Sequence, residues 1–161
     1  MPDREKADLI QGELEAARKD IKTDHYQMSI GELINLYKDE DIVLNPAYQR
    51  LFRWDDEKKT KLIESLLLGI PIPPIFVAQD EGGIWDVVDG VQRISTILQL
   101  TGDLKGYKPL ELTTCKYIPS LKGETWSTLS QEICRLIKRS RLTINIILTE
   151  NSIKSQRNPL L

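Results

Sequence analysis

Residues 85–100, WDVVDGVQRISTILQL, change from the pattern of a strand to that of a helix within a few residues. Residues 84–88 combine isoleucine, valine and tryptophan, as strands do. Beyond Gly90 the residues expected to face the core recur at helical spacing, at Ile94, Ile97, Leu98 and Thr101. Gly102 then provides a stop signal. The stretch therefore predicts a strand, a tight turn and a helix at the centre of the fold.

The turn at Gly90 has the features of an anion-binding site. Amide N–H groups at the start of a helix carry partial positive charge, and a glycine lets a ligand approach the backbone. Arg93, in the first turn, can offer two donors to phosphate oxygens. The alternative is structural: Asp89 caps the helix, and Arg93 pairs with a carboxylate such as Glu64 or Asp86. The sequence leaves both interpretations open.

A second polar loop lies upstream, in NPAYQRLFRW, residues 45–54. Its polar and aromatic residues are Tyr48, Gln49, Arg50, Phe52, Arg53 and Trp54. The two arginines can clamp the other end of an anion, the glutamine can contact a base or a ribose, and an aromatic ring can stack on a base. Phe52 and Trp54 have the alternative of anchoring the loop to the core, because the chain has few aromatic residues.

The remaining patterns predict helices that alternate with short strands. Helices are predicted at residues 3–20, 31–38, 57–69 and 130–139, and strands at 41–44, 75–78 and 141–148. Ser29 and Glu32 form a capping box for the second of these helices. Asp55 or Asp56 can cap the third helix, which Gly69 ends. The residues of the last helix expected to face the core are Ile133, Leu136 and Ile137.

The helix predicted at residues 3–20 is highly charged and has only a narrow apolar stripe. The stripe consists of Leu9, Ile10, Leu14, Ala17 and Ile21. A stripe of this width is too narrow for a helix packed into a core. We expect a peripheral helix or one that faces a partner.

The length and composition of the chain exclude several classes of function. The chain has 161 residues, the size of one domain, and a net charge of -2. No hydrophobic run approaches the length of a membrane span, so a cytoplasmic protein without a membrane partner is expected. The two cysteines fit no metal-ligand spacing. His25 is the only histidine, which excludes a His-Asn-His nuclease site within this chain.

The net charge conceals an asymmetry. Residues 1–100 hold 12 basic and 19 acidic side chains, whereas residues 101–161 hold 10 basic and 5 acidic ones. The basic C-terminal third, including Lys138, Arg139 and Arg141, can meet the phosphates of DNA. The alternative is a solvated surface without a partner.

Three motifs in this order, NPAYQRLFRW, IESLLLGIPIPPIFV and WDVVDGVQRISTIL, resemble the N-terminal domain of GmrSD-type proteins. This family is also known as domain of unknown function 262 and falls within the ParB and sulfiredoxin-like superfamily. The resemblance covers roughly residues 24–150, between an N-terminal charged helix at 1–23 and an irregular tail at 151–161. It implies an α/β fold, a small mixed sheet with flanking helices that holds a nucleotide between the arginine loop and the strand–turn–helix.

The family is associated with anti-phage defence in bacteria and archaea. The resemblance implies a nucleotide-binding and hydrolysing module that governs cleavage of modified foreign DNA, with Mg²⁺ and a nucleoside triphosphate as ligands. Relatives often carry a nuclease domain of the His-Asn-His type. Because this chain has no such motif, we expect a nuclease or effector domain to be missing from it.

The family's DGQQR motif falls on Asp89, Gly90, Val91, Gln92 and Arg93. The resemblance implies phosphate binding by Gly90 and Arg93, catalytic roles for Asp89 and Gln92, and a magnesium ion near Asp89. The upstream motif of the family falls on Tyr48, Gln49 and Arg50, and Arg53 follows them. Val91 departs from the motif, and a valine can neither donate to a phosphate nor orient a water. The departure therefore bears on hydrolysis more than on binding.

Two rival functions stay open. One is a DNA-binding or nicking module that uses the basic C-terminal third. The other is a catalytically inert interaction domain that docks through the helix at 3–20. Reductase chemistry of the sulfiredoxin branch is not expected, because Val91 and Gln92 stand where a catalytic cysteine would be required.

Overall fold

The computed structural model describes residues 3–45 and 53–149. Within these residues one mixed sheet of five strands has the order β1-β5-β3-β4-β2. The elements along the chain are α1 (Arg4–Asp20), β1 (Ile21–Ser29), α2 (Ile30–Lys38), β2 (Ile42–Val43), α4 (Asp56–Leu68), β3 (Ile75–Gln79), β4 (Trp85–Asp89), α5 (Val91–Thr101), the 3-10 helix η1 (Pro119–Leu121), α6 (Gln131–Arg139) and β5 (Arg141–Thr149). The α/β class and the mixed sheet with flanking helices are confirmed.

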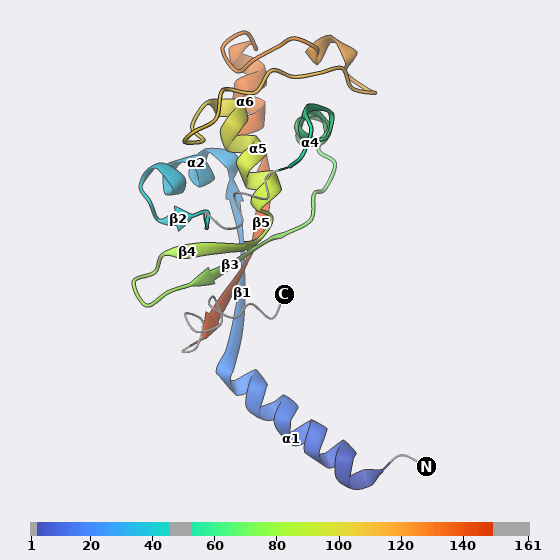
Figure 1. Cartoon of the computed structure of the whole chain (residues 1–161), viewed down its shortest axis with the longest axis vertical. Helices are drawn as coiled ribbons and strands as arrows, with labels where there is room; N and C mark the ends of the chain where they lie inside the picture. The colour runs from blue at the N-terminus through green and yellow to red at the C-terminus, as the bar shows by residue number, and fades with distance from the viewer. Residues whose placement is uncertain (1–2, 46–52, 150–161) are drawn as a thin grey trace.

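The sheet is mixed because it contains both antiparallel and parallel strand pairs. β3 and β4 form an antiparallel hairpin, and β1 pairs antiparallel with β5 along its whole length. β5 returns from the far end of the chain to lie parallel to β3, and β2 lies parallel to β4. Figure 1 shows α2, α4, α5 and α6 gathered at one end of the long β1–β5 ribbon, while α1 projects from the other end.

The core forms where α5 packs against the central strands. Ile75, Val77 and Ile144 on β3 and β5 are fully buried. The residues of α5 that are fully buried are Ile94, Ile97, Leu98 and Leu100. The expected burial of Ile94, Ile97 and Leu98 is therefore confirmed, whereas Thr101 is only half-buried and Leu100 is buried although it was not expected to be. Burial of this apolar surface is the main favourable contribution to folding.

The predicted N-caps and the glycine stop are also confirmed, but only half of the capping box is observed in the described residues: Glu32 Oε1 accepts from the hydroxyl of Tyr26 at 3.0 Å. Ser29 Oγ accepts a hydrogen bond from the amide of Glu32, and Asp55 Oδ1 accepts one from the amide of Lys58 at 2.8 Å. Gly69 ends α4 in the left-handed conformation, with φ of 72°. Each of these residues satisfies backbone groups that a helix end leaves without an intrahelical partner.

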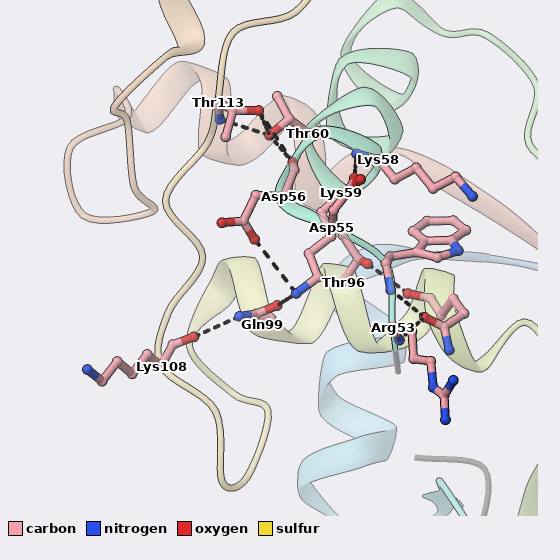
Figure 2. Close-up of polar contacts among 12 residues, drawn as sticks. Arg53, Asp55, Asp56, Lys58, Lys59, Thr60, Thr96, Gln99, Lys108 and Thr113 are labelled. Atoms are coloured by element: carbon pink, nitrogen blue, oxygen red, sulfur yellow. Dashed lines mark hydrogen bonds and ion pairs between the residues drawn. The ribbon is translucent and has the colours of Figure 1, made fainter. Parts of the chain in front are cut away.

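The contact between α4 and α5 includes buried polar groups (Figure 2). Lys59 Nζ donates to Gln99 Oε1 at 2.8 Å, and Gln99 Nε2 donates to the carbonyl oxygen of Lys108 at 3.1 Å. Thr60, the next residue of α4, accepts through Oγ1 a hydrogen bond from the amide of Thr113 at 2.9 Å. These bonds fasten the irregular segment after α5 to both helices.

Glu64 is a buried carboxylate with a structural role. Its Oε2 atom accepts hydrogen bonds from the amides of Tyr117 and Ile118, at 2.8 and 3.0 Å. The thiol of Cys115, followed by these two amides, holds the pKa of the Glu64 carboxyl below its usual range, against the opposing effect of burial. Glu64 is therefore not the partner of Arg93 that the sequence allowed.

Strand β1 was not predicted, and Ile21, placed in the apolar stripe of the first helix, is instead its first residue. Residues 22–27 of this edge strand, KTDHYQ, lack the apolar alternation that marks a half-buried strand. Pairing with the alternating strand β5 makes it a strand. The element is therefore a product of tertiary structure.

The expectation for Leu136 was wrong. Its side chain is 48% exposed, whereas Ile137 is fully buried. Successive residues of a helix point about 100° apart, so the burial of Ile137 turns its neighbour away from the core. No helix among residues 3–45 and 53–149 is long and apolar enough to cross a membrane.

Replacement of Glu64 by Gln is expected to lower the melting temperature at pH 7 and to lower it less near pH 3. The ordinary pKa of the carboxyl is 4.5 and the folded-state pKa is lower. The ionised group therefore stabilises the fold above its ordinary pKa, and this contribution is lost as the pH falls through the folded-state value. Thermal denaturation followed by circular dichroism at both pH values measures the difference.

The matched control for this comparison is Glu57→Gln, which removes an exposed carboxylate from the same helix. It should lower the melting temperature less at pH 7. Equal effects of the two substitutions at pH 7 would contradict the structural role of Glu64.

Candidate functional site

Gly90 joins β4 to α5 in a conformation that favours glycine. Its φ angle is 107°, and a Cβ atom built there would collide with Cδ1 of Ile75 and lie 3.2 Å from Nη2 of Arg93. Gly90 is also the N-cap of α5, and it supplies no side-chain acceptor to the first turn. Asp89 is the last residue of β4 and does not cap the helix, so that alternative from the sequence is wrong.

A cavity of about 370 Å³ lies at this turn. Its lining residues are Trp54, Val88, Asp89, Gly90, Val91, Gln92 and Arg93. The cavity thus combines the end of β4, the first turn of α5 and one residue from the segment before α4. A volume of this size is in the range of small-molecule sites.

Arg93 is a half-buried cation with few partners. Its Nη2 atom donates to the carbonyl oxygen of Pro74 at 3.1 Å, and its buried Nε atom has no hydrogen-bond partner in the described part of the chain. Burial lowers the pKa of the guanidinium, and the charge of Asp89 opposes this effect. No carboxylate in the described ranges forms an ion pair with Arg93, so pairing with Glu64 or Asp86 is not observed.

Gln92 connects the two motifs that the sequence placed at one site. Its Oε1 atom accepts hydrogen bonds from the amide of Arg53 at 3.1 Å and from the amide of Trp54 at 3.3 Å. The side chain thereby holds the segment before α4 against the first turn of α5. This anchoring contact is a role that sequence reasoning missed.

The residues of the upstream loop differ in whether they line the cavity. Trp54 packs against the core, as the anchoring alternative expects, and it also lines the cavity, while its stacking on a base stays a prediction. Arg53 has an exposed side chain and does not line the cavity. Tyr48, Gln49, Arg50 and Phe52 lie outside the described residues.

The acidic residues near the turn differ in their environments. Asp89 is exposed and lines the cavity. Asp86 is partly buried, and burial together with the charge of Asp80 raises the pKa of its carboxyl. Residues 3–45 and 53–149 contain no group of three or more His, Cys, Asp or Glu side chains arranged to hold a metal ion. A single carboxylate such as Asp89 suits a magnesium ion that is held mainly by phosphates and water.

Replacement of Gln92 by Ala is expected to release the amides of Arg53 and Trp54. Hydrogen exchange at these amides should become about fivefold faster, since a typical hydrogen bond contributes about 1 kcal/mol. Exchange measured by mass spectrometry on a peptide covering residues 53–54 gives the result. Gln92→Glu, which keeps an oxygen acceptor, should retain most of the protection, and unchanged exchange in Gln92→Ala would count against the anchoring role.

Comparison with protein families matches residues 30–159 to the family described as GmrSD restriction endonuclease, N-terminal domain. No curated protein and no solved structure matches the chain. The matched range includes the whole cavity, from Trp54 to Arg93, and every strand of the described sheet except β1. The chain therefore belongs to the family of GmrSD restriction endonuclease N-terminal domains.

Proposed function

We propose that the cavity at the start of α5 binds the phosphates of a nucleoside triphosphate, and that the chain serves as the nucleotide-binding module of a restriction system acting on modified DNA. The observation that carries the proposal is Arg93. A half-buried guanidinium normally finds several acceptors, because the desolvation of a charge is costly. Here one donor meets the Pro74 carbonyl, and Nε has no partner in the described residues.

The setting of Arg93 favours an anion over other ligands. The start of α5 contributes backbone amides and the positive end of its dipole at the cavity that Gly90 lines. A planar guanidinium matches two oxygens of a phosphate. The ring of Trp54 and the side chains of Val88 and Val91 add apolar surface for the remainder of a nucleotide.

The same geometry supports binding more strongly than hydrolysis. Val91 is buried and cannot orient a water, and Gln92 uses its side-chain oxygen to hold two amides. A magnesium ion, when bound with the nucleotide, would neutralise phosphate charge, and Asp89 would hold it. In this proposal the chain binds the nucleotide as a signal, and a nuclease or effector domain carries out DNA cleavage.

Isothermal titration with each nucleoside triphosphate in the presence of magnesium tests this function. We expect the wild type to bind at least one of them, and Arg93→Ala to weaken binding about tenfold or more, as for the loss of a charge-assisted pair. Arg139→Ala, which removes an exposed arginine from α6, should bind as the wild type does. Absence of binding at millimolar nucleotide, or equal binding by Arg93→Ala, would refute the proposal.

A second candidate function is DNA binding by α6. Arg135, Lys138 and Arg139 are exposed and lie within about one third of the helix circumference, on the side opposite the buried Ile137. In the described part of the chain, none of the three forms an ion pair with a carboxylate. Lys138 and Arg139 also complement the helix dipole in the last turn, but Arg135 lies one turn earlier. The cationic face therefore suits the phosphate backbone of DNA.

Binding of a short DNA duplex, measured by fluorescence anisotropy over a range of salt concentrations, tests this second function. The logarithm of the affinity should fall linearly with the logarithm of the salt concentration. Replacing Arg135, Lys138 and Arg139 together by Gln should reduce that slope by about two to three units. Arg93→Ala should leave the slope unchanged, and an equal slope in the triple variant would exclude α6 as the DNA contact.

A further inference from the structure

Helix α1 exposes apolar side chains that the rest of the structure does not cover. Leu9 is 63% exposed, Ile10 56% and Leu14 40%. Its main contacts are with β1, the strand that directly follows it, and Figure 1 shows it projecting beyond the β1–β5 ribbon. Large apolar side chains grouped on one element are typical of an interaction surface.

Contact with a partner would also stabilise α1 as a helix. The helix has 17 residues, only a little more than the roughly 12 to 15 below which an isolated helix is marginal in water even with an Ala-rich sequence. Gly12, in the middle of α1, lowers its helix propensity further. Packing of the apolar stripe against another surface would supply the missing stabilisation.

The spacing of the stripe indicates the kind of partner. Ala7, Ile10, Leu14 and Ala17 follow one another at intervals of three, four and three residues, which places them at positions a and d of a heptad repeat. Leu9, the most exposed of the three large apolar residues, lies at position c beside these positions. Positions a and d by themselves form the narrow seam that a two-stranded coiled coil buries. The two alanines allow the helix axes to approach closely.

The flanking charges fit a second copy of the same helix in the parallel orientation. In a parallel pair, Glu13 at position g lies next to the partner's Arg18 at position e, and the two charges attract. An antiparallel pair that sets Ile10 against the partner's Leu14 would bring Glu13 next to the partner's Glu13. It would also bring Arg4 next to the partner's Arg18. The same register would also bring Lys6 next to the partner's Asp20, an attraction that offsets part of this repulsion. The balance of charges still favours the parallel arrangement, in which the Glu13–Arg18 pairs attract.

We propose that α1 pairs with α1 of a second copy of this chain as a parallel two-stranded coiled coil. Both sheets then lie at the same end of the coil, since β1 leads directly from α1 into the sheet of each copy. The pairing uses no residue of the cavity beside Gly90. It is therefore independent of nucleotide binding.

Light scattering coupled to size-exclusion chromatography, across the micromolar range of protein concentration, tests the pairing. The mass should rise with concentration from 18.5 kDa toward twice that value. Leu14→Glu places a charge in the seam and should keep the chain monomeric. Ala16→Glu adds the same charge outside the seam and should dimerise as the wild type does. A wild type that stays monomeric, or a dimer that persists in Leu14→Glu, would overturn the proposal.

A charge exchange tests the orientation without disturbing the seam. Glu13→Arg and Arg18→Glu should each weaken dimerisation about threefold, and the double substitution should recover it, because the pair re-forms with its signs reversed. In an antiparallel pair, Arg18→Glu alone would strengthen the dimer by meeting the partner's Arg4. That result would overturn the parallel arrangement.

Discussion

The position of α5 depends on the absence of a side chain at Gly90. With φ of 107° and Ile75 in the way of any Cβ atom, only glycine can lead directly from the end of β4 into the first turn of the helix. That connection directs one face of α5 into the core, where Ile94 and Ile97 are fully buried. It also leaves the N-terminal end of the helix at the cavity. The packing of the domain and the chemistry of its candidate site therefore share one constraint.

Two charged side chains that are wholly or partly buried, Glu64 and Arg93, differ in how far the fold compensates their charges. Glu64 receives two backbone hydrogen bonds and the influence of the Cys115 thiol, so the cost of its burial is met within the fold. Arg93 has the carbonyl of Pro74 and a carboxylate, Asp89, that acts on it without forming an ion pair in the described residues. A compensated charge is typical of a structural role, whereas an incompletely compensated cation beside a cavity is typical of a ligand site.

The two candidate binding surfaces outside the cavity, on α6 and on α1, differ in charge and hydrophobicity. The face of α6 is cationic, whereas α1 combines an apolar seam with charges of both signs. Neither surface shares a lining residue with the cavity. Binding of a nucleotide, of DNA and of a second copy would therefore occupy separate regions, so that each can be altered without removing the groups that serve the others.

The sequence by itself determined the elements whose signals are local. Caps at Ser29 and Asp55, the stop at Gly69 and the apolar spacing of α5 and β5 each depend on neighbours a few residues away, and short-range sterics and hydrogen bonding decide them. The order of motifs was also sufficient to indicate the family, and the cavity formed at the predicted turn. The strand–turn–helix could be predicted because glycine requirements and periodicity are properties of the chain itself.

Only the tertiary structure decided the features that depend on residues far apart in the chain. Polar strand β1 exists because β5 pairs with it, more than a hundred residues later. Gln92 holds the amides of Arg53 and Trp54 across nearly forty residues of sequence, at a contact that no local pattern encodes. Glu64, one of the carboxylates that could have paired with Arg93, instead accepts hydrogen bonds from the amides of Tyr117 and Ile118 in the loop after α5. Desolvation and long-range hydrogen bonding depend on which segments of the chain are in contact. Local sequence patterns do not specify these tertiary contacts.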